Sequence, residues 1–271
     1  MLINRTANAI LAADKNKVPW KYWTATNILS EELISSLHVT CAPHTWPSLG
    51  EAHQKSIESC TEIYETGSFE TLWWEPGPKS NEQHIIDEYK GFRLYFRKGI
   101  ESKSSAAGEL IEIFTSSEVR EAFECVTRKS LDKTVVKLCY TQEKPGWKMH
   151  VHDDHPSTCK LTFLIYVPVL PVPEDCEMGT SMYNQDATLH HRAPYVNNTG
   201  QFFVPCSKKF RRTLHGFDGK IVEDRRFILI QYLTHTDIDV DNPKIPIEYD
   251  GIYSAPHVMD YDTVDTLWRV K

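Results

Sequence analysis

The sequence predicts an α+β protein in which helices pack outside an antiparallel β core. Two observations carry this prediction: helix patterns dominate the first part of the chain, and short β-rich runs dominate the part from about Val135 onward. With 41% hydrophobic and 25% charged residues, the 271-residue chain has an ordinary globular composition. We expect a single domain, residues 1–271, with a helix-rich part at about 1–133, a β core at about 134–235 and a tail at 236–271.

Three segments of the N-terminal part predict helices. Ser30 stands at an N-cap position, followed by two acids in the first turn and apolar residues at 33, 34 and 37. Residues 108–114 and 117–129 predict two further helices with a break at residues 115–116, and an apolar stripe marks the second. We expect these helices to be packing elements.

Seven or so short strands are predicted in the second part, and no helix pattern separates them. The segments between them are rich in turn residues, such as EKPG, PVPEDCEMG and NNTG. Close spacing without intervening helices favours an antiparallel sandwich or barrel. The β-rich runs are VVKLCY, WKMHVH, KLTFLIYVPV, TSMYN, QFFVP, RTLHGF and RRFILIQYL.

Charge, hydropathy and cysteine usage exclude several classes of function. The net charge of -7 argues against a nucleic-acid-binding protein. The longest apolar run, near residues 161–169, is too short to span a bilayer, and the N-terminus lacks the apolar region of a signal peptide. The seven cysteines are scattered without a C-x-x-C pair, which favours free thiols in a reducing cytoplasm.

The densest chemical motif is HVHDDH, residues 150–155, which indicates a metal site. One interpretation is the zinc motif of metallo-β-lactamase-type hydrolases, with His215, Asp237 and His257 as further ligands. That fold alternates strands and helices, and small residues that open a helix follow its motif. Here a β-rich run follows, so we treat the zinc hydrolase as the rival hypothesis.

The preferred interpretation is His-x-Asp, the first part of a facial triad for non-haem iron. If WKMHVH is a strand that runs into a turn, His152 and Asp154 point the same way and Asp153 points to the opposite face, where we expect a surface acid. His215, 63 residues after His152 (215 − 152), is the candidate third ligand. Ten residues further on, Arg225 begins an apolar strand. A guanidinium in such a place can bind a carboxylate through two hydrogen bonds.

From about Tyr140 to Tyr232 the chain resembles the 2-oxoglutarate- and Fe(II)-dependent dioxygenase superfamily, and it is most similar to the prolyl-4-hydroxylase-like branch. The elements of that pattern occur here in order, although Val167-Pro168 replaces the commoner Leu-Asn. The resemblance implies a double-stranded β-helix, or jelly-roll, core. The matching elements are HDD at 152–154, TFLIYVP at 162–168, GTSMY at 179–183, His215 and Arg225.

The resemblance also implies roles for individual residues and a reaction. Its metal ligands for Fe(II) would be His152, Asp154 and His215. The distal carboxylate of 2-oxoglutarate would bind Arg225 and the hydroxyl of Tyr166, and Tyr140 would line the same pocket. Arg226 remains an alternative receptor for that carboxylate, because the face of each arginine depends on strand register.

The implied activity is hydroxylation of an unactivated C–H bond with O2, with release of succinate and CO2. The presence of the Asp154 ligand favours hydroxylation over halogenation, because related halogenases lack this carboxylate. We expect a small-molecule substrate, since no docking domain for a macromolecule is visible, and the oligomeric state is left open. The alternatives are the zinc hydrolase and a non-catalytic cupin-like binding module.

Overall fold

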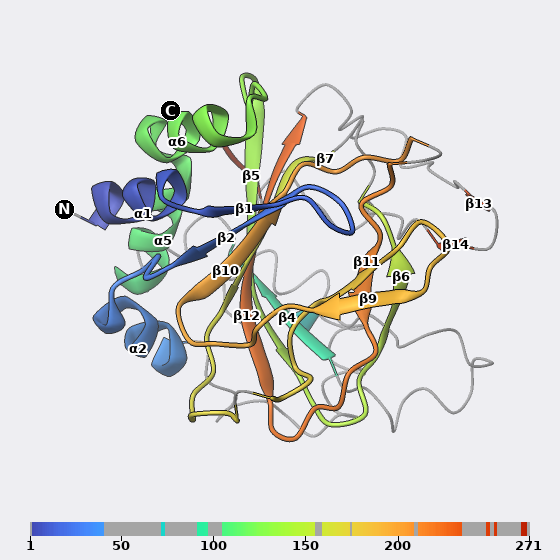
Figure 1. Ribbon diagram of the computed structural model, residues 1–271. Coiled ribbons are helices and arrows are strands. Elements are labelled where there is room, and N and C mark those ends of the chain that lie inside the picture. The colour runs from blue at the N-terminus through green and yellow to red at the C-terminus, as the bar shows by residue number, and fades with distance from the viewer. Residues whose placement is uncertain are drawn as a thin grey trace, which may run out of the picture.

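Two antiparallel sheets face each other, and helices cover the outer side of the larger one (Figure 1). The computed structural model describes residues 2–40, 72–73, 91–96, 105–154, 159–173, 175–208, 211–234, 248–249, 252–253 and 267–269. None of the helices in these ranges has the length and apolar character needed to cross a bilayer.

The larger sheet runs in the order β1-β2-β10-β7-β12-β5-β4-β3, and β15 also pairs with β5. At its centre β12 pairs with β5 over ten residues, from Arg225 opposite Glu143 to Thr234 opposite Thr134. The bounds are β1 (Asp14–Asn16), β2 (Tyr22–Thr26), β3 (Leu72–Trp73), β4 (Gly91–Tyr95), β5 (Thr134–Glu143), β7 (Cys159–Tyr166), β10 (Thr199–Phe203), β12 (Arg225–Thr234) and β15 (Leu267–Arg269).

The smaller sheet carries part of the metal motif. Its order is β6-β11-β8-β9, so the strand of the HVHDDH motif lies beside the strand that begins at His215. A separate hairpin joins β13 (Glu248–Tyr249) to β14 (Ile252–Tyr253). The strands of the smaller sheet are β6 (Met149–His152), β8 (Ser181–Tyr183), β9 (Leu189–Arg192) and β11 (His215–Phe217).

The helices lie together against one face of the larger sheet (Figure 1). The predicted Ser30 cap is present, since its hydroxyl accepts a 3.1 Å bond from the Leu33 amide. The predicted break is also present: Ser116 caps the last helix through the Val119 amide. The helices are α1 (Leu2–Leu11), α2 (Glu31–Thr40), α5 (Ser105–Thr115) and α6 (Ser117–Thr127).

Phe123 is the centre of the core between α6 and the sheet. Its ring makes edge contacts with Phe163, Phe202 and Tyr232 at centroid distances of 5.6, 5.0 and 5.6 Å. The Tyr232 hydroxyl donates a 2.7 Å bond to the Phe114 carbonyl, so its one polar group is satisfied. The predicted role of these helices as packing elements is therefore confirmed.

Strands from outside the predicted core also join the larger sheet. β1, β2, β3 and β4 come from the part of the chain predicted to be helix-rich, and β15 comes from the predicted tail. The sheet is therefore wider than the seven β-rich runs indicated, because short strands can be recruited by pairing alone.

Candidate metal centre

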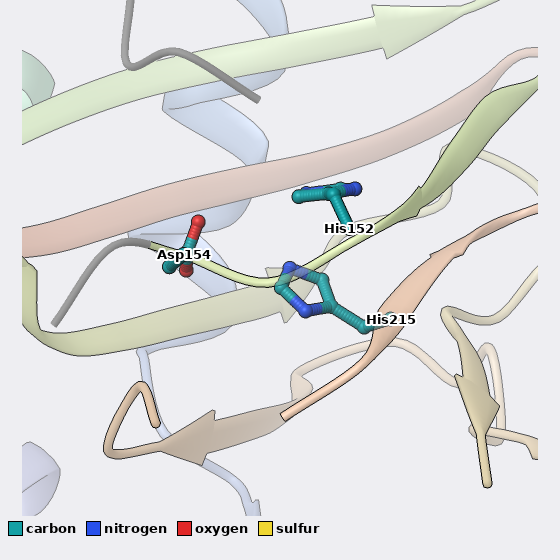
Figure 2. A group of neighbouring side chains, drawn as sticks. All are labelled: His152, Asp154 and His215. Atoms are coloured by element: carbon teal, nitrogen blue, oxygen red, sulfur yellow. The ribbon is translucent and has the colours of Figure 1, made fainter. Parts of the chain in front are cut away.

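His152, Asp154 and His215 come together at the edge of the smaller sheet. His152 ends β6 and His215 begins β11, and the two are direct partners in the strand register. Their ring centroids are 4.3 Å apart. One potential ligand atom from each of the three side chains lies within 4.8 Å of the others, and Figure 2 shows the group. All three residues are buried, so the site is shielded from bulk water.

Two of the candidate ligands are held by hydrogen bonds. Nδ1 of His215 lies 2.8 Å from the Thr213 carbonyl oxygen, which can only accept, so Nδ1 carries the proton. Nε2 is then the nitrogen with a free lone pair for a metal. The Thr162 hydroxyl of β7 donates to Oδ2 of Asp154. Asp154 thus receives its support from the larger sheet.

Asp153 lies between the candidate ligands His152 and Asp154 and is fully buried, so the expectation of a surface acid is wrong. Its carboxylate accepts two bonds from Arg212, at 2.8 Å from Nε and 3.1 Å from Nη2. Gln185 in turn accepts a bond from the Arg212 amide and donates one to its carbonyl, each 2.8 Å long. This ion pair connects the His152–Asp154 segment to the segment that leads into His215.

The donor set fits ferrous iron. Two imidazoles and one carboxylate on one side of a metal are the arrangement of non-haem iron oxygenases. Some catalytic zinc sites use the same ligand types, so the fold and not the donor set separates the two hypotheses. His155, Asp237 and His257, which the zinc hypothesis needs, lie outside the described residues. The antiparallel sheets also differ from the alternating strands and helices which that hypothesis requires.

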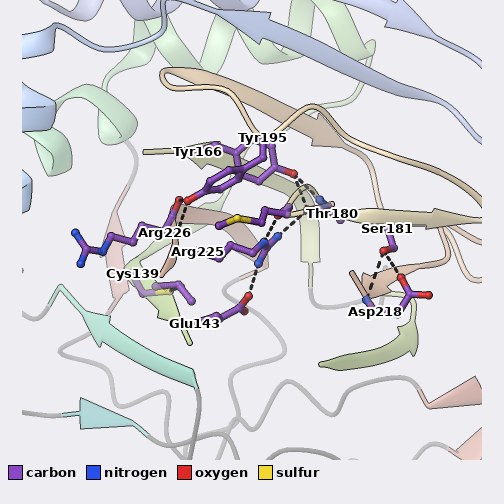
Figure 3. A network of polar contacts seen from close by, with 11 residues as sticks. Cys139, Glu143, Tyr166, Thr180, Ser181, Tyr195, Asp218, Arg225 and Arg226 are labelled. Carbon is purple, nitrogen blue, oxygen red and sulfur yellow. Dashed lines mark hydrogen bonds and ion pairs between the residues drawn. The ribbon is translucent and has the colours of Figure 1, made fainter. Parts of the chain in front are cut away.

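Arg225 points between the two sheets and is buried. Its guanidinium lies 4.4 Å from the Phe217 ring centroid and 4.5 Å from that of Phe227. It donates to the Met178 carbonyl through Nε, to Glu143 through Nη1 and to the Thr180 hydroxyl through Nη2, the last at 3.3 Å. Aromatic rings and polar groups thus surround the predicted carboxylate receptor, and Figure 3 shows its polar contacts.

Tyr166 belongs to the same network. Its hydroxyl donates a 2.7 Å bond to the Thr180 hydroxyl and accepts a 3.0 Å bond from the Thr180 amide. Gly179 permits this arrangement, because a Cβ at that position would lie 1.6 Å from the Ala193 carbonyl oxygen. The Gly-Thr element of the sequence pattern therefore places a hydroxyl between Tyr166 and Arg225.

Arg226 and Tyr140 lie on the other face of the larger sheet. Arg226 makes a 3.4 Å ion pair with Asp224 and points away from the Arg225 network (Figure 3). The Tyr140 hydroxyl lies 2.9 Å from Nδ1 of His38 on α2. Burial lowers the pKa of His38, and the charge of Arg226 lowers it further. The structure thus brings Arg225 and Tyr166 into the interior but does not bring Tyr140 there.

Four interior residues were not predicted from the sequence. Thr162 supports Asp154, Glu143 and Thr180 contact Arg225, and Lys137 is buried on the interior face of β5. Strand alternation would have put Thr162 on the same face as Tyr166, since the two are four residues apart. The place of Glu143 follows only from the pairing register of β5 with β12.

No protein-family model matches the sequence, and a search of curated proteins finds no match either. Among solved structures, a prolyl-4-hydroxylase from Pseudomonas putida is similar with a TM-score of 0.51 at 12% identity, over 87% of this chain and 100% of that one. A dioxygenase for auxin oxidation in rice has a TM-score of 0.50 at 11% identity, over 87% of this chain and 80% of that one.

These likenesses establish the fold. The chain has the double-stranded β-helix fold of these two solved structures, so the predicted jelly-roll core with packing helices is confirmed.

Proposed function

We propose that the chain is an Fe(II)- and 2-oxoglutarate-dependent oxygenase that hydroxylates an unactivated C–H bond of a small molecule. One observation carries the proposal: a buried His152, Asp154 and His215 triad on a jelly-roll whose interior also holds a buried arginine, Arg225. A metal-binding group and a receptor for a distal carboxylate are what a chelating 2-oxo diacid requires.

Each residue of the interior has a part in this proposal. His152, Asp154 and His215 hold the metal and leave positions for a bidentate cosubstrate and O2. When bound, the iron supplies the chemistry that converts 2-oxoglutarate and O2 to succinate and CO2 while the substrate is hydroxylated. Arg225 binds the distal carboxylate, and the hydroxyl network of Tyr166 and Thr180 orients it.

A small-molecule substrate is supported by the rice neighbour, which is named for the oxidation of auxin. The Pseudomonas neighbour is named as a prolyl-4-hydroxylase, so a prolyl peptide is the second substrate class to test.

The described cysteines form no disulfide, and this supports a reducing compartment such as the cytoplasm.

The test is an anaerobic titration of the protein with Fe(II) and 2-oxoglutarate. We expect the weak visible charge-transfer band of such complexes and, in air, release of succinate. Both should be lost in Asp154→Ala and kept in Asp186→Ala, which removes an exposed carboxylate. Bound zinc without the band would support the hydrolase instead, and metal binding without succinate would support a cupin-like binding module.

A further inference from the structure

The proposed receptor for the distal carboxylate already has an acidic partner within the protein. Nη1 of Arg225 donates to Oε2 of Glu143, and the side chains are only 3% and 1% exposed. Both residues face the interior between the sheets, where Figure 3 shows them together. Such a pair is far from water, so its charges are not screened as those of a surface salt bridge are.

Glu143 is fixed beside Arg225 by the fold. The two residues are direct partners in the register of β5 and β12, and the side chains of such partners begin about 5 Å apart. Separating the carboxylate from the guanidinium is therefore a movement of side chains, and the register of the strands can stay the same.

The other groups around Arg225 leave little room for a second acid. Nε is bonded to the Met178 carbonyl and Nη2 to the Thr180 hydroxyl, so each nitrogen of the guanidinium has a protein partner. Phe217 and Phe227 lie 4.4 and 4.5 Å from the guanidinium carbon. The Nε edge faces the backbone carbonyl of Met178, so we expect a bidentate ligand carboxylate at the other edge, which Glu143 and Thr180 occupy.

Two carboxylates on one buried guanidinium repel each other, because the interior screens their charges weakly. Without a ligand, however, Glu143 removes the larger penalty of a buried and unpaired arginine. The same carboxylate thus stabilises the ligand-free protein and opposes a dianionic ligand.

On the basis of the proposed function, we propose that Glu143 is an internal competitor of the cosubstrate's distal carboxylate. It pairs with Arg225 while the site is empty of cosubstrate and releases Nη1 when 2-oxoglutarate binds. Glu143 is accordingly a residue that sets cosubstrate affinity and selectivity. It weakens the binding of 2-oxo acids that need Arg225 and leaves 2-oxo acids without a distal carboxylate unaffected.

The test compares the full chain with Glu143→Gln in anaerobic titrations monitored by the charge-transfer band. The Fe(II)-loaded proteins are titrated with 2-oxoglutarate and with 2-oxopentanoate, which has the same chain length but no distal carboxylate. We expect Glu143→Gln to bind 2-oxoglutarate about tenfold more tightly, equivalent to about 1.4 kcal/mol, and to bind 2-oxopentanoate unchanged. The control Glu121→Gln, on the exposed surface of α6, should change neither affinity.

Weaker or unchanged 2-oxoglutarate binding in Glu143→Gln would overturn the inference, as would equal tightening for both ligands. If this variant folds poorly, Glu143→Asp keeps the charge on a shorter side chain and should give a smaller gain in the same direction. Thermal unfolding is a second readout: 2-oxoglutarate should raise the Tm of Glu143→Gln more than that of the unmodified chain.

Failure of the proposed function would look different. In that case neither 2-oxo acid would give the charge-transfer band with the unmodified chain. If only the competitor inference fails, the unmodified chain still binds 2-oxoglutarate. Its affinity is then the same as that of Glu143→Gln.

Discussion

Both faces of β12, at the centre of the larger sheet, are largely buried, but they differ chemically. On the helix side, β12 presents Ile228, Ile230 and Tyr232, and helices cover them. On the interior side the same strand presents Arg225 and Gln231 beside Phe227, and all three are buried. Burial alone therefore does not tell which face of a strand serves stability and which serves binding.

The difference lies in how each face contributes to the free energy of unfolding. Apolar burial on the helix side stabilises the fold by roughly 25 cal/mol per Å². Interior polar groups are costly to bury unless paired, and several are paired here, through contacts such as Thr162 to Asp154 and Arg212 to Asp153. We therefore expect substitutions on the helix side to change stability and substitutions on the interior side to change binding.

The largest effect is expected from a substitution that removes metal binding but leaves the thermal stability of the metal-free protein unchanged. His215→Ala should abolish Fe(II) binding, because two ligands remain of a three-ligand site. The metal-free variant should unfold at nearly the same temperature as the metal-free parent. Calorimetric metal titration and a thermal melt measure the two quantities. A metal-free melt lowered by many degrees would show that the triad also serves the core.

The converse substitution is Phe123→Ala on α6. It removes the ring that contacts Phe163, Phe202 and Tyr232 and should cost about 3–5 kcal/mol of unfolding free energy. Urea denaturation measures the loss. Metal affinity of the folded fraction should remain within about twofold of the parent, and a larger change would mean that the two faces are coupled.

A smaller effect is expected from Arg212→Lys. The ammonium keeps the charge near Asp153 but loses the two-bond geometry, so the ligand segments are held less firmly. Metal affinity should fall about tenfold, the lower end of the effect seen for groups that support ligands. Arg120→Lys, at a partly exposed position of α6, is the matched control, and an equal loss in that variant would contradict the assignment.

The smallest effect is expected from Tyr140→Phe. The hydroxyl bonds to His38 on the helix side, so its removal should leave 2-oxoglutarate affinity within about twofold. Stability should fall by about 1 kcal/mol, the usual value of one hydrogen bond. A clear loss of cosubstrate affinity would restore Tyr140 to the pocket, where the sequence resemblance had placed it.

Much of the interior could be predicted from the sequence. The residues that mark it are either close together in the chain or occur in the order of a known family pattern. The His-x-Asp spacing indicated a shared face, and the distances along the chain to His215 and Arg225 selected those two residues. The Ser116 break between two helices was equally visible, since a capping residue acts within its own turn.

The remaining features depended on pairing that the sequence does not encode locally. Asp153 was taken as a surface acid because its partner Arg212 lies 59 residues away. Tyr140 was placed in the pocket by the family resemblance, although it and the interior-facing Glu143 differ by an odd number of positions along β5. The side of each residue became clear only once the register of β5 with β12 was known.

That register also has a consequence for how the protein folds. The pairing of β5 with β12 joins Glu143 to Arg225, residues 82 apart, and β12 then lies between β5 and β7. A growing chain cannot complete the centre of this sheet until β12 has been synthesised. Contacts of such long range favour slow folding, and until β12 arrives the edges of β5 and β7 remain open to other chains. We expect chaperones to matter during the production of this protein more than its modest size would indicate.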